Sequence, residues 1–256
     1  MRIVVIGASS GLGRCIGVGL AQRGAQVALL ARRRERLEDA AAEAGAGAVA
    51  IECDVTDEAA CQAAVRDAAI ALGGIDALVY ATGIGTLGPL VETDADTWRR
   101  VFDTNVVGAA VATAAAVPYL AESNGCALYL SSISASQTAP WPGLGAYAVS
   151  KAALDKLVEA WRAEHPHVGF TRVVGGDCGG GEGDAVSGFP GEWDMELAAE
   201  MVPIWLARGY MTGTLLEVDE LISMVDAVVQ RGATVCIPSV TVTPRPPAPA
   251  PAEELA

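Results

Sequence analysis

Short runs of apolar residues recur along the chain, and each is followed by a longer amphipathic stretch. Runs that are apolar throughout, rather than alternating with polar residues, indicate strands covered on both faces. These runs lie at residues 3–6, 27–30, 48–52, 77–80, 127–130, 168–174 and 234–237. Helical periodicity is found between them, at residues 12–23, 34–44, 58–72, 95–120, 146–163 and 219–230. Strands that alternate with helices predict right-handed crossovers and a parallel sheet.

The pattern therefore predicts an α/β fold, a doubly wound Rossmann-type parallel sheet of about seven strands in a single domain. We expect this domain to span residues 1–240. Residues 241–256 are rich in Pro and Ala, and proline lacks the amide donor that helices and sheets need, so a mobile tail is expected there. The Gly-rich stretch 175–191 is expected to be a long loop, where ligand contacts often lie.

The charge of the chain excludes some classes of function. There are 17 Lys+Arg against 31 Asp+Glu in 256 residues, a formal net charge of −14. An acidic surface repels phosphate backbones and anionic lipid headgroups, so we expect neither nucleic acid nor a membrane as a partner. The uncharged stretch 104–121 approaches membrane-spanning length, but it is mostly Ala and is expected to be a buried helix.

The start of the chain and its cysteines indicate the compartment. An apolar strand pattern begins directly after Met1 and Arg2, which leaves no room for a signal peptide, so a cytoplasmic protein is expected. The 6 cysteines lack the spacing of a disulfide framework or a zinc site. We expect them to be small buried apolar residues and predict no metal site.

A glycine-rich turn between the first strand and the first helix is the first candidate site. Glycines there allow backbone angles that a side chain would obstruct, and they let a pyrophosphate approach the amides and the positive end of the helix. The alternative is a tight structural turn, but its place at the first strand of an α/β chain favours nucleotide binding. The predicted cofactor contacts here are Gly7, Ser9, Ser10, Gly11, Leu12 and Gly13.

The residues after the second and third strands indicate which dinucleotide binds. Folds that prefer NAD usually offer a carboxylate to the ribose after the second strand, whereas this chain has Arg32 and Arg33. A guanidinium suits a 2′-phosphate, so NADP(H) is predicted in preference to NAD(H), with Arg32 as the first contact and Arg33 as the second. Alternatively, these arginines belong to a solvated helix face. Asp54, with Val55 beside it, is expected to meet the adenine edge.

Tyr147 and Lys151 lie four residues apart on the predicted helix 146–163, so both side chains fall on one face. A nearby cation favours the phenolate, and we therefore expect the pKa of Tyr147 to fall from its ordinary value of about 10. A tyrosine with a lowered pKa is suited to general acid/base work. This spacing alone is common, but it gains weight beside the glycine turn and the strand–helix order.

With these motifs the chain resembles the short-chain dehydrogenase/reductase family over about residues 2–240. The resemblance implies hydride transfer between NADP(H) and a ketone or aldehyde and its alcohol, with a catalytic set of Asn, Ser, Tyr and Lys. Tyr147 would exchange a proton with the substrate oxygen, and Lys151 would lower its pKa and hold the nicotinamide ribose. Asn105 would order a water in the proton relay, or else satisfy a kinked backbone as a buried structural residue.

The family's serine falls on one of two positions. Counting from Asn105, or from Gly125 through the strand 127–130, gives Ser132, whereas counting back from Tyr147 gives Ser134. We prefer Ser132, because a strand end fixes a position while the loop 135–143 can absorb an insertion.

Two segments depart from the family pattern. The usual Asn-Asn-Ala-Gly after the fourth strand is replaced by Tyr80, Ala81, Thr82 and Gly83. Ala81 and Gly83 still let the backbone approach the adenosine ribose, but Tyr80 takes the place of a stabilising amide. After the sixth strand, Asp177 adds a charge where a polyanionic cofactor is expected.

These departures leave two functions open. The leading hypothesis is an oxidoreductase acting on a small or medium apolar carbonyl or alcohol substrate. The second is a non-catalytic NADP(H)-binding sensor or scaffold. The resemblance further implies a homodimer or homotetramer, assembled through the helices of Asn105 and Tyr147 and through the last strand.

Overall fold

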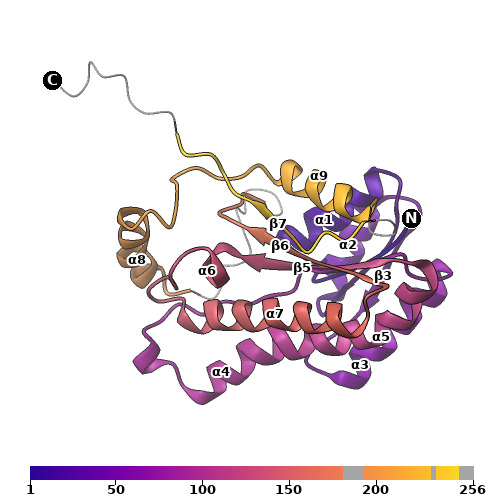
Figure 1. Cartoon of the computed structure of the whole chain (residues 1–256), viewed down its shortest axis with the longest axis horizontal. Helices are drawn as coiled ribbons and strands as arrows, with labels where there is room; N and C mark the ends of the chain where they lie inside the picture. Colours follow the sequence, from indigo (N-terminus) through magenta and orange to yellow (C-terminus); the bar gives the residue numbers. More distant parts are fainter. Residues whose placement is uncertain (181–192, 232–234, 248–256) are drawn as a thin grey trace.

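The computed structural model describes residues 1–180, 193–231 and 235–247. One parallel sheet of 7 strands has the order β3-β2-β1-β4-β5-β6-β7 (Figure 1). The strands are β1 Arg2–Ile6, β2 Gln26–Ala31, β3 Ala48–Glu52, β4 Ala77–Tyr80, β5 Cys126–Ser132, β6 Gly169–Gly175 and β7 Ser239–Val242. The helices are α1 Gly11–Gln22, α2 Arg34–Ala44, α3 Glu58–Leu72, α4 Ala95–Phe102, α5 Gly108–Ser123, α6 Ile133–Ser136, α7 Gly145–Glu164, α8 Met195–Ala207 and α9 Val218–Val229. Two short turns, 3-10 helical Leu90–Glu92 and π-helical Asp103–Val107, complete the described elements.

Helices cover both faces of the sheet. One buried apolar cluster joins α1, α2 and α9 to the sheet, and a second joins α3, α5 and α7 to its opposite face. Figure 1 shows these two layers, with α9 and α7 on opposite sides of β5 and β6. Residues 3–6 of the central strand β1 are fully buried, as expected for a strand covered on both faces. The prediction of a single doubly wound Rossmann-type domain is confirmed.

The strand order reverses direction at β1, which has β2 on one side and β4 on the other. Ile6 is in register with Leu30 of β2 and with Tyr80 of β4, and Tyr80 is in register with Tyr129 of β5. The segments that follow these residues therefore leave the sheet at one common edge. In open α/β sheets, ligands bind at this edge, where the strand order reverses.

The helix predicted at residues 95–120 is present but contains a wider turn. α4 continues through the π-helical turn Asp103–Val107 into α5, so that one helix extends from Ala95 to Ser123. By length and composition alone this helix could cross a membrane, but 50% of its apolar window is buried inside the protein, as in a core helix. Tyr80 is fully buried and donates a hydrogen bond to the Thr104 carbonyl in the π-helical turn. Its ring therefore packs in the core.

The strand predicted at residues 234–237 is misplaced: the last strand is β7, and residues 235–238 are irregular. Arg172 of β6 sets the register of β7 against β6, because its backbone N–H donates to the carbonyl of Pro238, directly before β7, at 3.2 Å. β7 is an edge strand with only Val240 and Val242 half-buried, so its sequence alternates instead of being apolar throughout. The pattern that located the central strands therefore misses it.

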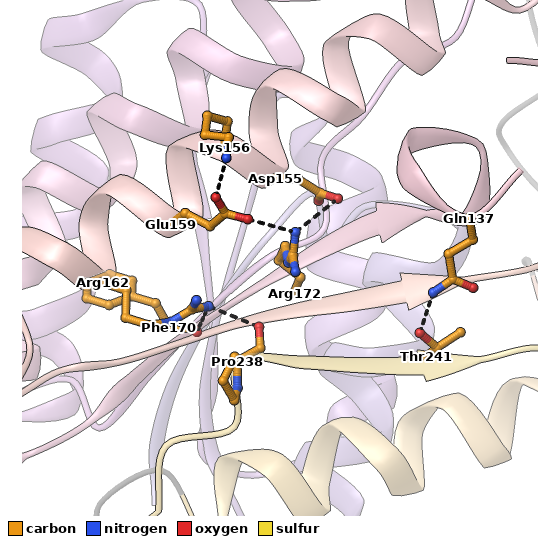
Figure 2. Close-up of polar contacts among 9 residues, drawn as sticks. All are labelled: Gln137, Asp155, Lys156, Glu159, Arg162, Phe170, Arg172, Pro238 and Thr241. Carbon is orange, nitrogen blue, oxygen red and sulfur yellow. Dashed lines mark hydrogen bonds and ion pairs between the residues drawn. The ribbon is translucent and has the colours of Figure 1, made fainter. Parts of the chain in front are cut away.

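The expected domain boundary at residue 240 falls inside β7. Thr241, which follows the boundary, accepts a hydrogen bond of 2.6 Å from the Gln137 side chain (Figure 2). Residues 241 and 242 are thus part of the sheet. Residues 243–247 are irregular, and the Arg245 carbonyl accepts a hydrogen bond of 2.7 Å from the Thr214 hydroxyl. The rest of the predicted tail, residues 248–256, lies outside the part of the chain that the structure describes.

Helix α8 was not predicted from the sequence. The Asp194 carboxylate caps its first turn by accepting hydrogen bonds from the backbone N–H groups of Glu196 and Leu197. The helix carries Trp205 against Trp141, with 5.3 Å between the ring centroids. This contact is the centre of a third apolar cluster, which includes Ile133 from α6, Val174 from β6 and the neighbouring ring of Tyr210. α8 thus lies beside the ends of β5 and β6 (Figure 1).

Candidate active site

The glycine-rich turn packs tightly between β1 and α1. Gly7 has a φ of +91°, in the left-handed region that favours glycine, and its N–H donates to the Leu30 carbonyl at 2.8 Å. A Cβ on Gly13 would lie 2.3 Å from the Gly7 carbonyl oxygen, so only glycine fits at that helix position. Ser10, the N-cap residue of α1, makes no side-chain cap hydrogen bond. The turn therefore has the cradle shape and the helix start that a pyrophosphate requires.

Arg33, rather than Arg32, contacts the glycine-rich turn. Its Nη2 donates to the hydroxyl of Ser9 at 3.1 Å and to the hydroxyl of Ser10. Arg32 is exposed, and its charge acts on the carboxylate of Asp54. The two arginines thus flank the end of β2, one over the glycine turn and the other toward the segment after β3.

Asp54 and Val55 follow β3 and are held locally. Asp54 Oδ1 accepts hydrogen bonds from the N–H and the hydroxyl of Thr56, at 2.9 and 2.7 Å. Burial tends to raise the pKa of Asp54, but these hydrogen bonds and the Arg32 charge hold it below its ordinary value. Val55 is buried against the start of α5, where a Cβ on Gly108 would come within 2.9 Å of the Val55 carbonyl oxygen. Contact with the adenine edge stays a prediction for both residues.

The segment after β4 extends toward the proposed catalytic residues. The Ala81 N–H donates to the Ile6 carbonyl at 2.9 Å, which keeps the segment beside the glycine turn. A Cβ on Gly83 would lie 3.1 Å from Lys151 Nζ and 3.6 Å from Asn105 Oδ1. Gly83 therefore lies against these two side chains, and its expected contact with the adenosine ribose stays a prediction.

Asn105 ties this segment to α7. It is fully buried in the π-helical turn, and its side-chain oxygen accepts a hydrogen bond from the Ile84 N–H at 2.8 Å. Its amide nitrogen donates to the Ile84 carbonyl and to the Ser150 hydroxyl, each at 2.9 Å. Ser150, which the sequence analysis missed, donates in turn to the Tyr147 carbonyl at 2.7 Å. Asn105 therefore positions the backbone around the site, and its ordering of a water stays a prediction.

Tyr147 lies at the start of α7 and forms a side-chain hydrogen bond with Ser132. Burial of the phenol outweighs this hydrogen bond and raises the pKa of Tyr147 to about 12. The predicted fall of that pKa is therefore wrong for this structure. The Lys151 ammonium is 5.8 Å from the Tyr147 ring centroid and donates instead to the Leu130 carbonyl at 2.7 Å.

Lys151 is itself perturbed by its surroundings. The residue is only 4% exposed, and this burial lowers its pKa to about 8, because the charged form loses its hydration. The carboxylate of Asp155 acts in the opposite direction and favours the ammonium. A buried cation whose charge depends on its neighbours thus lies one helical turn from Tyr147.

The two candidate serines contact each other. Ser132, at the end of β5, lies 2.9 Å from Ser134 between the side-chain oxygens, and it also accepts a hydrogen bond from the Ser134 N–H at 3.2 Å. Ser134 is buried at the start of α6. The hydrogen bond with Tyr147 comes from Ser132, which Ser134 contacts in turn. The catalytic role of either serine stays a prediction.

The segment after β6 lies over the start of α1. The Asp177 carbonyl accepts a hydrogen bond of 2.8 Å from the Leu216 N–H, and a Cβ on Gly180 would lie 3.0 Å from the Leu12 side chain. Burial raises the pKa of Asp177 to about 6. The rest of the predicted loop, residues 181–191, lies outside the described ranges.

Comparison with known proteins gives the family of the chain. A family model described as short chain dehydrogenase matches residues 1–187. The chain belongs to the short-chain dehydrogenase/reductase family. Within this family it is 38% identical over 167 residues to a short chain dehydrogenase of Pseudocercospora fijiensis, covering 63% of this chain and 53% of that protein. It is 34% identical over 180 residues to 11-beta-hydroxysteroid dehydrogenase A of Sesamum indicum, covering 68% and 51%.

The matches to these two dehydrogenases span only about half of their length. A solved structure gives fuller coverage: the 3-ketoacyl-ACP reductase from Sinorhizobium meliloti 1021 is 27% identical and superposes with a TM-score of 0.79. That match covers 94% of this chain and 96% of the reductase. The fold of this short-chain dehydrogenase/reductase therefore agrees with family members over nearly its whole length.

Proposed function

We propose that this short-chain dehydrogenase/reductase is an NADP(H)-dependent oxidoreductase that interconverts a ketone or aldehyde and an alcohol. The observation that carries the proposal is the hydrogen bond between Tyr147 and Ser132 beside the buried Lys151. These groups lie at the same edge of the sheet as the glycine-rich turn. When bound, the nicotinamide supplies the hydride that converts the carbonyl carbon to an alcohol carbon.

The raised pKa of Tyr147 suits proton donation. A phenol with a pKa of about 12 is protonated at neutral pH, so it is in the form that gives a proton to a carbonyl oxygen during reduction. Ser132 orients the phenol and can stabilise the developing oxyanion. The Lys151 ammonium stabilises the phenolate that remains after the proton has been transferred.

The residues at the glycine turn fit a dinucleotide. The pyrophosphate would be held by the backbone amides of the turn and the start of α1, where any side chain on Gly13 would fill the cradle. Arg33 above Ser9 and Ser10, with Arg32 alongside, would bind the 2′-phosphate that distinguishes NADP(H) from NAD(H).

Replacing Arg33 with Ala is expected to weaken NADPH binding about ten- to a hundredfold, because a hydrogen bond to a charged group contributes about 1.5–3 kcal/mol. NADH binding should be nearly unchanged, because NADH lacks the 2′-phosphate. Titrations of both cofactors followed by nicotinamide fluorescence measure the two effects.

The matched control is Arg34→Ala on α2, whose guanidinium pairs with Glu38 on the exposed helix face. It should leave both affinities close to those of the unchanged protein. An equal loss of NADH and NADPH affinity in Arg33→Ala would argue against a 2′-phosphate contact.

The proposed activity is tested with the purified protein, NADPH and a panel of aldehydes, apolar ketones and the corresponding alcohols. We expect NADPH oxidation with an equal amount of alcohol formed from at least one carbonyl compound. Apolar substrates are favoured by the aromatic cluster of Trp141, Trp205 and Tyr210 beside the ends of β5 and β6.

The second candidate, an NADP(H)-binding sensor or scaffold, is favoured by Asp177, a half-buried acid in the segment that lies over the glycine turn. Micromolar or tighter cofactor binding without turnover on the whole panel would support it over the oxidoreductase. In either case we propose self-association through the helices of the site, where Val107 and Val149 are 49% and 44% exposed.

A further inference from the structure

A row of polar and charged side chains extends along α7 away from Tyr147. Lys151, Asp155 and Glu159 follow Tyr147 at successive intervals of four residues, so all of them fall on one face of the helix. This face packs against β5 and β6. Figure 2 shows Asp155 and Glu159 of α7 both directed toward Arg172 of β6.

Asp155 is a carboxylate buried inside the protein. Its residue is only 5% exposed, and Arg172 Nη1 lies 3.6 Å from its Oδ2. Neither Asp155 oxygen accepts a geometrically good hydrogen bond from any residue in the described ranges. Burying an ionised carboxylate is costly unless opposite charges compensate it. Burial raises the pKa of Asp155, and the Ser131 hydroxyl, Arg172 and Lys151 oppose this effect by favouring the carboxylate.

Arg172 connects Asp155 to the outer part of the row. The same Nη1 atom lies 3.3 Å from Glu159 Oε1, and Glu159 also pairs with the exposed Lys156. Arg172 is therefore held between two carboxylates of α7. Its position on β6 fixes the guanidinium beside Asp155, since β6 is in register with β5 and β7.

The surroundings of Lys151 contain few charges. Titratable or charged side chains come from α7 and β6 and are Tyr147, Asp155, Glu159 and Arg172. The other neighbours of this pair are uncharged: the Leu130 carbonyl and the Ser131 hydroxyl on β5, and Asn105 across Gly83. Asp155 is the anion whose field acts directly on the buried ammonium, and it opposes the effect of burial.

We propose that Asp155 is a positioning residue that keeps Lys151 protonated, and that Arg172 holds Asp155 in place for this task. The proposal rests on the proposed function, in which the Lys151 cation stabilises the Tyr147 phenolate. Lys151 carries its charge below its pKa and loses it above. Removing the Asp155 anion should lower that pKa, so the active form should be lost at a lower pH as the pH rises.

The chain offers a direct measurement, because Lys151 and Lys156 are its two lysines. Lysine labelled with carbon-13 gives two side-chain NMR signals in an untagged protein, and Lys156→Arg identifies the one from Lys151. In Asp155→Asn, which keeps the shape of the side chain, we expect the Lys151 signal to titrate about one pH unit lower than in the unchanged protein. This measurement needs neither cofactor nor substrate.

Glu159→Gln is the matched control, since it removes the same charge from the same helix face one turn farther from Lys151. It should move the Lys151 titration much less than Asp155→Asn, and Asp155→Glu should restore most of the original midpoint. Circular dichroism establishes that each variant folds. If Asp155→Asn does not fold, Asp155→Ser removes the charge with a smaller side chain and carries the same expectation.

Activity provides the second readout. The basic limb of the pH profile for carbonyl reduction is expected near pH 8 in the unchanged protein and at lower pH in Asp155→Asn, in step with the NMR midpoint. An unchanged Lys151 midpoint in Asp155→Asn, or an equal shift in Glu159→Gln, would overturn the proposal. If no substrate is turned over, the proposed function fails, while the NMR titration still decides whether Asp155 controls Lys151.

Discussion

Carbonyl reduction by the Tyr147→Phe variant is expected to be about 10²- to 10⁴-fold slower than by the unchanged protein. The substitution removes the hydroxyl that donates the proton, and it leaves the ring that packs at the start of α7. The Ser132 hydroxyl loses its partner, but Ser134 still lies 2.9 Å away. Cofactor affinity should change little, because the glycine turn, Arg33 and Lys151 are untouched.

The kcat values of Tyr147→Phe and of the unchanged protein are measured with NADPH and one carbonyl substrate. The NADPH affinity of both proteins is measured by nicotinamide fluorescence. Tyr119→Phe on α5 is a suitable control, because it removes the same hydroxyl from a half-buried tyrosine away from the site. Turnover by Tyr147→Phe at the rate of the unchanged protein would refute the assigned proton donor. Loss of cofactor binding together with turnover would indicate a folding defect.

Gly13→Ala is expected to abolish cofactor binding and to lower the melting temperature by several degrees. The new Cβ would lie 2.3 Å from the Gly7 carbonyl oxygen and 2.8 Å from its carbon, so the backbone of the turn must move away from α1. Overpacking of this kind costs about 1–3 kcal/mol, and each kcal/mol lowers the melting temperature of a protein of this size by about 2–4 °C. The displaced turn also loses its cradle for the pyrophosphate.

Thermal melts with and without NADPH separate these two effects, because a ligand that binds only the folded protein raises its melting temperature. We expect NADPH to raise the melting temperature of the unchanged protein and to have no effect on Gly13→Ala. The control is Gly88→Ala, where a Cβ would meet nothing within 4 Å. Normal stabilisation of Gly13→Ala by NADPH would show that the cofactor does not need this cradle.

The central part of the fold could be predicted because its strands are buried on both faces. Apart from Arg2 and Gln26 at their starts, β1 and its neighbours are apolar throughout, and this local property is visible without knowing the partners. β7 could not be found in this way, because an edge strand with one exposed face follows a different pattern. The π-helical turn was missed as well, since no residue of Asp103–Val107 is a helix breaker that would mark a wider turn.

The site shows the same division between local and distant determinants. The glycine turn and the pair of Tyr147 and Lys151 are encoded in short stretches of sequence, so their positions could be predicted. The pKa of Tyr147 could not, because its direction depends on how deeply the folded chain buries the phenol. The role proposed for Asp155 was equally hidden, because it depends on Arg172, which reaches α7 only when β6 joins the sheet.

The aromatic cluster around α8 gives the protein an optical property. Trp141, Trp193 and Trp205 are three of its 5 tryptophans, and the ring of Trp205 lies within 6.0 Å of both others between centroids. The Trp193 indole N–H also donates to the Gly85 carbonyl, in the segment that Asn105 ties to α7. Because three of the 5 tryptophans lie in this cluster, we expect the wavelength of the tryptophan emission to shift when water enters this wall of the site.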